Sequence, residues 1–320
     1  MLQIAKSKLS VSITSVFLFC FSWAQDVNIV YPVEEIEKKL THETFEIFRF
    51  RDLRFEGDIG KRVILKYEDG KDLQIKWRRA LNEGHTFNNA PRFEIAAYEL
   101  QKLFLDESDF VVPPTIARGY LLPEYLSIEK EAVPTFKKSN VVLVMMQYWL
   151  NEVSIGGEIY DKEKFDNNPV YAKHFANTNI MTFIISHKDS NEGNLLTSLN
   201  KDNPRVFTVD NGVTFSSPES DKGTIWKYLH VDRLPEKTIN RLKNITLDDL
   251  NKQLGVVTQL SVTGNSVDVV KPTENLNPRK GVRQKGNIIQ IGLTKSEIKT
   301  VNKKIQYIVK RAKKNKYDLF

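Results

Sequence analysis

The chain has 320 residues, of which 41% are hydrophobic and 27% charged, and its formal net charge is +7. This length predicts about two domains or lobes, and the composition excludes a wholly disordered or fibrous protein. The single cysteine excludes an intramolecular disulfide framework and a cysteine-based zinc site.

Residues 1–24 have the pattern of a secretory signal peptide. Two lysines precede an uncharged, apolar stretch, residues 9–24, which is shorter than a membrane-spanning helix of about 20 residues. Ser22 and Ala24 are small residues at the positions that a cleavage site after Ala24 requires. We therefore expect an exported protein, and an uncleaved membrane anchor is the alternative.

Strand patterns dominate residues 45–77, after a polar lead-in over 26–40. Two alternating apolar runs in that region are separated by a short turn that contains Asp69-Gly70, a strong signal for a β-hairpin. Apolar residues then recur at helical spacing over 93–104. A continuous apolar run, residues 141–146, predicts a strand that is buried on both faces.

Helical patterns dominate the rest of the chain. We expect helices at residues 174–185, 235–242, 246–254 and 294–314. Short strands are expected at 195–196 and 206–209, between the first two of these helices. The polar stretch 263–285, which contains prolines and glycines, predicts a surface excursion. Strands followed mainly by helices predict an α+β protein with two lobes.

Two polar loops carry the residue types that phosphoryl transfer requires. Asp189 and Asn194 lie in one loop, and Asp210 ends the strand that returns beside it. The reaction needs a carboxylate that orients the attacking hydroxyl, and oxygen ligands that hold Mg²⁺ against the phosphates. Each loop alone is an ordinary turn sequence, and only their combination in this order indicates a site.

The sequence Asp-x-x-x-Gly-Asn-Leu-Leu, followed by Val-Asp-Asn-Gly, resembles the catalytic and metal-binding loops of the atypical protein-kinase-like superfamily. That superfamily includes phosphatidylinositol 3-/4-kinase-like, HipA-like and secreted Golgi casein-kinase-type kinases. The resemblance covers roughly residues 50–312. It implies a sheet-rich N-lobe, residues 25–150, a mostly helical C-lobe, residues 151–320, and a nucleotide cleft between them.

The resemblance also implies roles for individual residues. Asp189 would orient or deprotonate the acceptor hydroxyl, and Asn194 and Asp210 would hold Mg²⁺ or Mn²⁺. Lys76 would contact the ATP phosphates and pair with Glu94, for which Glu99 and Glu83 are alternatives. Three further positions would line the nucleotide: Gly57 and Gly60 in the loop over the phosphates, and Gln147 near the hinge.

One departure from the family bears on activity. Ser190 and Asn191 replace the common Arg-His of the catalytic loop, and His187 is a candidate substitute for that histidine. The sequence therefore predicts an exported, metal-dependent phosphotransferase that moves the γ-phosphate of ATP to a hydroxyl of a protein, lipid or sugar. The alternative is a pseudokinase that acts as a nucleotide- or partner-binding module. Transfer of the nucleotide itself is a third, weaker interpretation.

The positive charge is concentrated at the two ends of the chain. Residues 1–24 carry +2 and residues 301–320 carry +6, so the remainder of the chain carries −1. A nearly neutral body argues against nucleic acid as a partner. Lysines at the end of a helix suit its dipole, and contact of this basic helix with an anionic membrane is a secondary interpretation.

Overall fold

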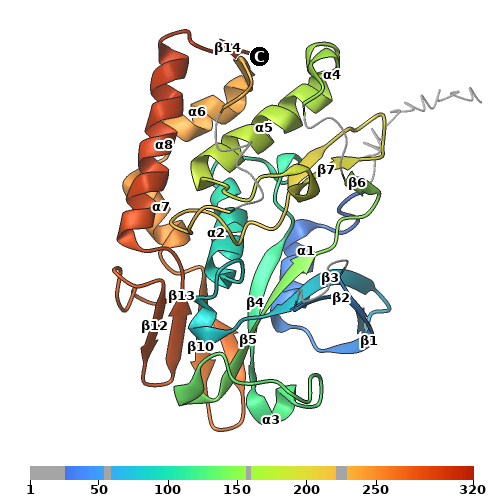
Figure 1. Cartoon of the computed structure of the whole chain (residues 1–320), viewed down its shortest axis with the longest axis vertical. Coiled ribbons are helices and arrows are strands. Elements are labelled where there is room, and N and C mark those ends of the chain that lie inside the picture. The colour runs from blue at the N-terminus through green and yellow to red at the C-terminus, as the bar shows by residue number, and fades with distance from the viewer. Residues whose placement is uncertain (1–25, 54–58, 156–159, 221–228) are drawn as a thin grey trace, which may run out of the picture.

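The computed structural model describes residues 26–53, 59–155, 160–220 and 229–320, and the predicted signal peptide lies outside these residues. Figure 1 shows the strands of the two larger sheets in the lower half of the molecule and most of the longer helices in the upper half. This division corresponds to a sheet-rich lobe and a mostly helical lobe.

A five-stranded antiparallel sheet forms the centre of the sheet-rich lobe. In spatial order its strands are β1 (Phe45–Asp52), β2 (Gly60–Tyr67), β3 (Asp72–Arg79), β5 (Val141–Tyr148) and β4 (Thr115–Leu121). The predicted hairpin joins β2 to β3, and Gly70 in its turn has a φ of 81°, in the left-handed region that favours glycine.

Two helices pack beside this sheet. Helix α1 (Val33–His42) contacts β4 and buries Val33, Ile36 and Leu40, so the prediction of a polar lead-in was wrong for this segment. Helix α2 (Pro91–Gln101) contacts both β4 and helix α7 (Leu247–Leu254) of the helical lobe. It therefore lies at the boundary between the lobes, as Figure 1 shows. The short helix α3 (Leu122–Tyr125) follows β4.

Strand β5 is buried on both faces, as predicted, because a second sheet covers its outer face. That sheet contains, in spatial order, β11 (Val267–Val270), β10 (Thr258–Val262), β13 (Ile288–Ile291) and β12 (Val282–Lys285). Val141 and Leu143 belong to one apolar cluster with Leu260 and Ile289, whereas Val142 and Val144 belong to the main core. Strands β11 and β12 belong to this sheet, so the predicted surface excursion over 263–285 holds only for the connection between them, residues 271–280, which is exposed or half-buried.

Gly119 permits the two sheets to pack closely. It lies in β4, and a Cβ atom at this position would lie 2.9 Å from Leu260 Cδ1 and closer still to Val267 Cγ1. A side chain at this position would clash with Leu260 and Val267, so these side chains or the strands that carry them would have to move.

The helical lobe contains α4 (Lys162–Asn167), α5 (Pro169–Ile185), α6 (Glu236–Asn244), α7 and α8 (Lys295–Lys313). Its small sheets are β6 (Val153–Ile155) with β7 (Leu195–Ser198) and β8 (Val206–Thr208), and β9 (Arg233–Leu234) with β14 (Asp318–Leu319). The helices and strands that the sequence predicted in this half are present, with small shifts at their ends. Throughout the described ranges, each helix is too short or too polar to cross a bilayer.

Candidate active site

The two loops that carry the predicted catalytic and metal-binding residues lie side by side. The hairpin of β7 and β8 joins them, with Leu195 paired to Thr208. The N–H of Val209 donates to Asn194 O at 3.0 Å, and the N–H of Lys188 donates to Val213 O at 2.9 Å. Backbone hydrogen bonds therefore fix both loops at one end of the small sheet.

Asp189 is buried, with 4% of the residue exposed, and its carboxylate is held from several sides. Asn191 Nδ2 donates to Oδ1 at 3.2 Å, and Asn194 Nδ2 donates to Oδ2 at 3.3 Å and to the backbone oxygen of Asp189 at 2.7 Å. Ser220 Oγ donates to Oδ1 at 2.9 Å. These donors fix the orientation of the carboxylate.

Asn191, rather than His187, contacts Asp189 by hydrogen bonds. Besides the bond to Oδ1, its Nδ2 donates to the backbone oxygen of Asp189 at 3.1 Å. The ring of His187 is fully buried, and among the described residues no hydrogen bond joins it to Asp189. Burial lowers the pKa of His187 to about 4, although the charge of Asp189 and the backbone of Val209 oppose this shift. His187 is therefore a buried, neutral residue at neutral pH.

Lys76 connects the sheet-rich lobe to Asp210. It lies on β3 and is 7% exposed, and its Nζ pairs with Asp210 Oδ1. Asp210 follows β8 and has a φ of 54°, a left-handed conformation that aspartate tolerates better than most residues. The side chain of Asp210 remains 37% exposed. This ion pair brings together two residues 134 positions apart.

Glu94, on α2, contacts the residue that follows Asp210. It is 2% exposed, and its Oε2 accepts a hydrogen bond from the N–H of Asn211 at 2.9 Å. Its Oε1 has no hydrogen-bond partner among the residues that the structure describes. A Cβ atom on Gly212 would lie 3.3 Å from Oε1, so the glycine gives this carboxylate room.

The two alternatives to Glu94 have other surroundings. Glu99 accepts hydrogen bonds from Lys102 Nζ at 2.7 Å and from Gln253 Nε2 at 2.6 Å. Glu83 is exposed in a short turn with a φ of 56°. Of the three acids, Glu94 is the one with a hydrogen bond to the Asp210 loop.

Of the three residues predicted to line the nucleotide, Gln147 lies on the same sheet face as Lys76. Gln147 is paired with Lys76 across β3 and β5, and paired residues point to the same face of a sheet. Its Nε2 donates to Thr115 Oγ1 at 2.9 Å. Gly60 is buried at the start of β2, and Gly57 lies outside the described residues.

The donor set suits a hard divalent cation. Asp210 offers carboxylate oxygens, and Asn194 offers its amide oxygen, because its Nδ2 is used by Asp189. In the described ranges, no group of three or more His, Cys, Asp or Glu side chains is arranged so that it could hold a metal ion by itself. A cation that takes few protein ligands and completes its shell with phosphate oxygens and water, as Mg²⁺ does, fits these residues.

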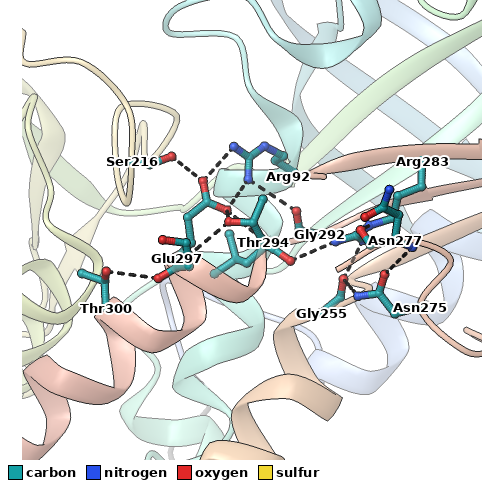
Figure 2. A network of polar contacts seen from close by, with 12 residues as sticks. Arg92, Ser216, Gly255, Asn275, Asn277, Arg283, Gly292, Thr294, Glu297 and Thr300 are labelled. Atoms are coloured by element: carbon teal, nitrogen blue, oxygen red, sulfur yellow. Dashed lines mark hydrogen bonds and ion pairs between the residues drawn. The ribbon is translucent and has the colours of Figure 1, made fainter. Parts of the chain in front are cut away.

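A polar network that the sequence did not predict holds the start of α2. Figure 2 shows Arg92 and Glu297 facing each other, with Ser216 and Thr294 beside the same carboxylate. Arg92 donates two hydrogen bonds to Glu297, at 2.7 and 2.9 Å, and Ser216 Oγ also donates to it. Burial raises the pKa of Glu297, but these hydrogen bonds outweigh it and hold the pKa below its ordinary value.

Comparisons with known proteins identify the fold. A scan against protein-family models finds no match, and neither does a search of curated proteins. The structure of hydra Fam20 with sugar superposes with a TM-score of 0.52 at 16% sequence identity, covering 92% of this chain and 95% of that one. The crystal structure of the Golgi casein kinase gives a TM-score of 0.51 at 11% identity, covering 90% and 77%. The predicted α+β, two-lobed atypical kinase-like fold is therefore confirmed.

Proposed function

We propose that this protein is an exported, metal-dependent phosphotransferase that moves the γ-phosphate of ATP to a hydroxyl of a protein, lipid or sugar. The observation that carries the proposal is the pair of contacts between the lobes, Lys76 with Asp210 and Glu94 with Asn211. These contacts join β3 and α2 to the loop after β8, and that loop is hydrogen-bonded to the one that holds Asp189. The shared fold of Fam20 and the Golgi casein kinase supports the same reaction class.

In this proposal the ion pair between Lys76 and Asp210 marks where the phosphates bind. Each group satisfies the charge of the other. Nucleotide binding would give Lys76 a phosphate oxygen to contact, and Asp210 and Asn194 would hold Mg²⁺ or Mn²⁺. The metal would neutralise charge on the phosphates during transfer. Gln147, which is paired with Lys76 on the neighbouring strand β5, would lie close to the nucleotide.

Asp189 would receive the proton of the acceptor hydroxyl. Its carboxylate already has fixed hydrogen-bond donors in Asn191 and Asn194, so it needs little reorganisation to orient a hydroxyl. Asn191 would supply the support that the family's histidine commonly gives.

The test uses the purified mature chain with labelled ATP, Mg²⁺ or Mn²⁺, and a panel of hydroxyl-bearing peptides, sugars and inositol lipids. Asp189→Asn should lower transfer by about 100-fold or more, as expected for loss of a general base, and should leave nucleotide binding intact. Lys76→Met and Asp210→Asn should remove the rise in melting temperature that nucleotide with metal produces. Asp268→Asn, an exposed aspartate on the distal strand β11, is the matched control.

A pseudokinase that binds nucleotide or a partner is the second candidate function. The replacement of Arg-His by Ser190 and Asn191 is the observation that favours it. Stabilisation by nucleotide with no transfer to any acceptor, to water or to the protein itself would support this candidate. Mass analysis of the products would reveal transfer of the nucleotide instead of the phosphate. If nucleotide neither stabilises the protein nor is turned over, both candidate functions are contradicted.

Export and membrane contact remain proposals of the same kind. The signal-peptide pattern of residues 1–24 supports export, and the basic end of α8 supports peripheral contact with an anionic surface. Cosedimentation with vesicles that contain phosphatidylserine, compared with neutral vesicles, tests the second proposal. Binding that is equal for both vesicle types would contradict it.

A further inference from the structure

Asp189 already holds a hydroxyl group of the protein itself. Ser220 Oγ donates a hydrogen bond to Asp189 Oδ1 at 2.9 Å, and Ser220 is half-buried. Within the described ranges, the amides of Asn191 and Asn194 also donate to this carboxylate. A hydroxyl that donates to the carboxylate is the arrangement that an acceptor must adopt before its proton is removed.

The preceding chain is anchored, which restricts where Ser220 can lie. The N–H of Phe215 donates to Ile185 O at 2.5 Å. Lys188 binds this segment twice: its N–H donates to Val213 O at 2.9 Å, and its Nζ donates to Ser217 O. Ser217 is itself buried. The segment after Asp210 is therefore fixed to the catalytic loop until shortly before Ser220.

We propose that Ser220 occupies the acceptor position and is phosphorylated within its own chain. This inference rests on the proposed phosphotransferase function. Ser220 Oγ would form a bond to the γ-phosphorus of ATP, and the bond from that phosphorus to the β,γ-bridging oxygen would break. ADP leaves with the electron pair of the broken bond, and the hydroxyl proton passes to Asp189.

Phosphorylation of Ser220 would separate this side chain from Asp189. A phosphoserine carries a charge of about −1.5 to −2 near neutral pH, and this charge would lie beside the carboxylate of Asp189. Repulsion would move the modified side chain away from the carboxylate. Asp189 would then be accessible to the hydroxyl of a separate acceptor.

The contact itself is tested without nucleotide. Melting temperatures are measured for Asp189→Ala, Ser220→Ala and the double variant. If the hydroxyl and the carboxylate interact, the melting temperature of the double variant falls by less than the sum of the falls in the two single variants. Strictly additive losses would overturn the inference, because the hydroxyl would then have no interaction with Asp189. Ser127→Ala removes an exposed hydroxyl after α3 and is the control. Its effect on the melting temperature should be strictly additive with that of Asp189→Ala.

The modification is tested with ATP and Mn²⁺ or Mg²⁺ by peptide mass analysis. We expect one phosphate on Ser220, formed at a first-order rate that is independent of protein concentration. Ser220→Ala should lose this phosphate, Ser220→Thr should carry it on threonine, and Ser127→Ala should retain it on Ser220. Transfer to water or to an added acceptor without modification of Ser220 would overturn the inference and leave the proposed function standing. Absence of nucleotide binding and of all transfer would overturn both.

Discussion

Arg92 and Glu297 form a bidentate ion pair between the first turn of α2 and the first turn of α8, 205 positions apart in the chain. Both side chains are largely buried, at 11% and 5% exposure. Glu297 also closes the capping box of α8 with Thr294 and accepts a hydrogen bond from Ser216. One carboxylate therefore links α2, the segment after Asp210 and the last long helix (Figure 2).

Breaking this pair should destabilise the protein and weaken the candidate site. Arg92→Ala leaves a buried carboxylate without its cation, which costs about 3–5 kcal/mol of unfolding free energy in comparable pairs. Glu94 lies two residues after Arg92 in the first turn of the same helix, so loss of the Arg92 anchor should also reduce the rise in melting temperature that nucleotide produces. Urea unfolding and thermal shift check the two effects. The charge-swapped variant Arg92→Glu/Glu297→Arg should recover part of both losses.

A matched pair in the sheet-rich lobe provides the control. Arg79 also makes two hydrogen bonds to one glutamate, Glu129, but that glutamate is 40% exposed. Glu129→Gln should cost no more than about 1 kcal/mol, because exposed ion pairs contribute little. Equal effects of Arg92→Ala and Glu129→Gln on nucleotide binding would contradict a positioning role for Arg92.

Asn191 should matter for transfer more than for nucleotide binding. Asn191→Ala removes one of the two side-chain donors to Asp189 Oδ1, of which Ser220 is the other among the described residues, but no contact to Lys76 or Asp210. We expect the rate of transfer to fall by about tenfold to a hundredfold, the range for supporting residues around a catalytic group. The nucleotide concentration for half-saturation should stay the same. Asn191→His should recover activity in part, whereas loss of nucleotide affinity in Asn191→Ala would contradict this role.

The sequence was informative where the determining contacts are local. Asp189, Asn194 and Asp210 could be placed together because the intervening hairpin of β7 and β8 is short. The β2–β3 hairpin was marked by Asp69-Gly70, and the continuous apolar run of β5 correctly indicated burial on both faces. These signals depend on turn chemistry and side-chain alternation, which a single sequence contains.

Contacts between distant segments could not be predicted. The sheet of β10–β13 has alternating apolar residues, such as Leu260 and Val262, but long polar connections conceal them. The sequence does not indicate that β4 packs against this sheet, because the close approach at Gly119 depends on the positions of Leu260 and Val267 in the folded chain. The contacts of Glu297 with Arg92, and of Ser220 with Asp189, join parts of the chain whose relative positions depend on the whole fold.

Gly119 should be intolerant of substitution. In Gly119→Ala the added methyl group meets Leu260 and Val267 across the sheets, and overpacking of this kind costs about 1–3 kcal/mol. Urea unfolding measures the change. Gly264→Ala, at a position in the turn between β10 and β11 with no neighbouring atom within 4 Å, should change the unfolding free energy little. A cost for Gly264→Ala as large as that for Gly119→Ala would contradict close sheet packing as the cause.

The burial of neutral His187 predicts that stability falls in mild acid. Burial lowers its pKa in the folded protein to about 4, from an ordinary value of 6.5. Between these values the unfolded chain binds a proton that the folded protein does not. The contribution of neutral His187 to the free energy of unfolding is therefore fully present above pH 6.5. It is lost as the pH falls towards 4, by an amount on the order of 3 kcal/mol.

Urea unfolding of the wild type and of His187→Leu across this pH range tests the prediction. The variant keeps an apolar side chain of similar size but has no proton to bind, so its stability should depend less steeply on pH. His174 is also buried with its pKa lowered by burial, so it adds to the loss in both proteins and leaves a residual slope in the variant. Identical slopes in the two proteins would show that His187 is already protonated, or already exposed, in the folded state.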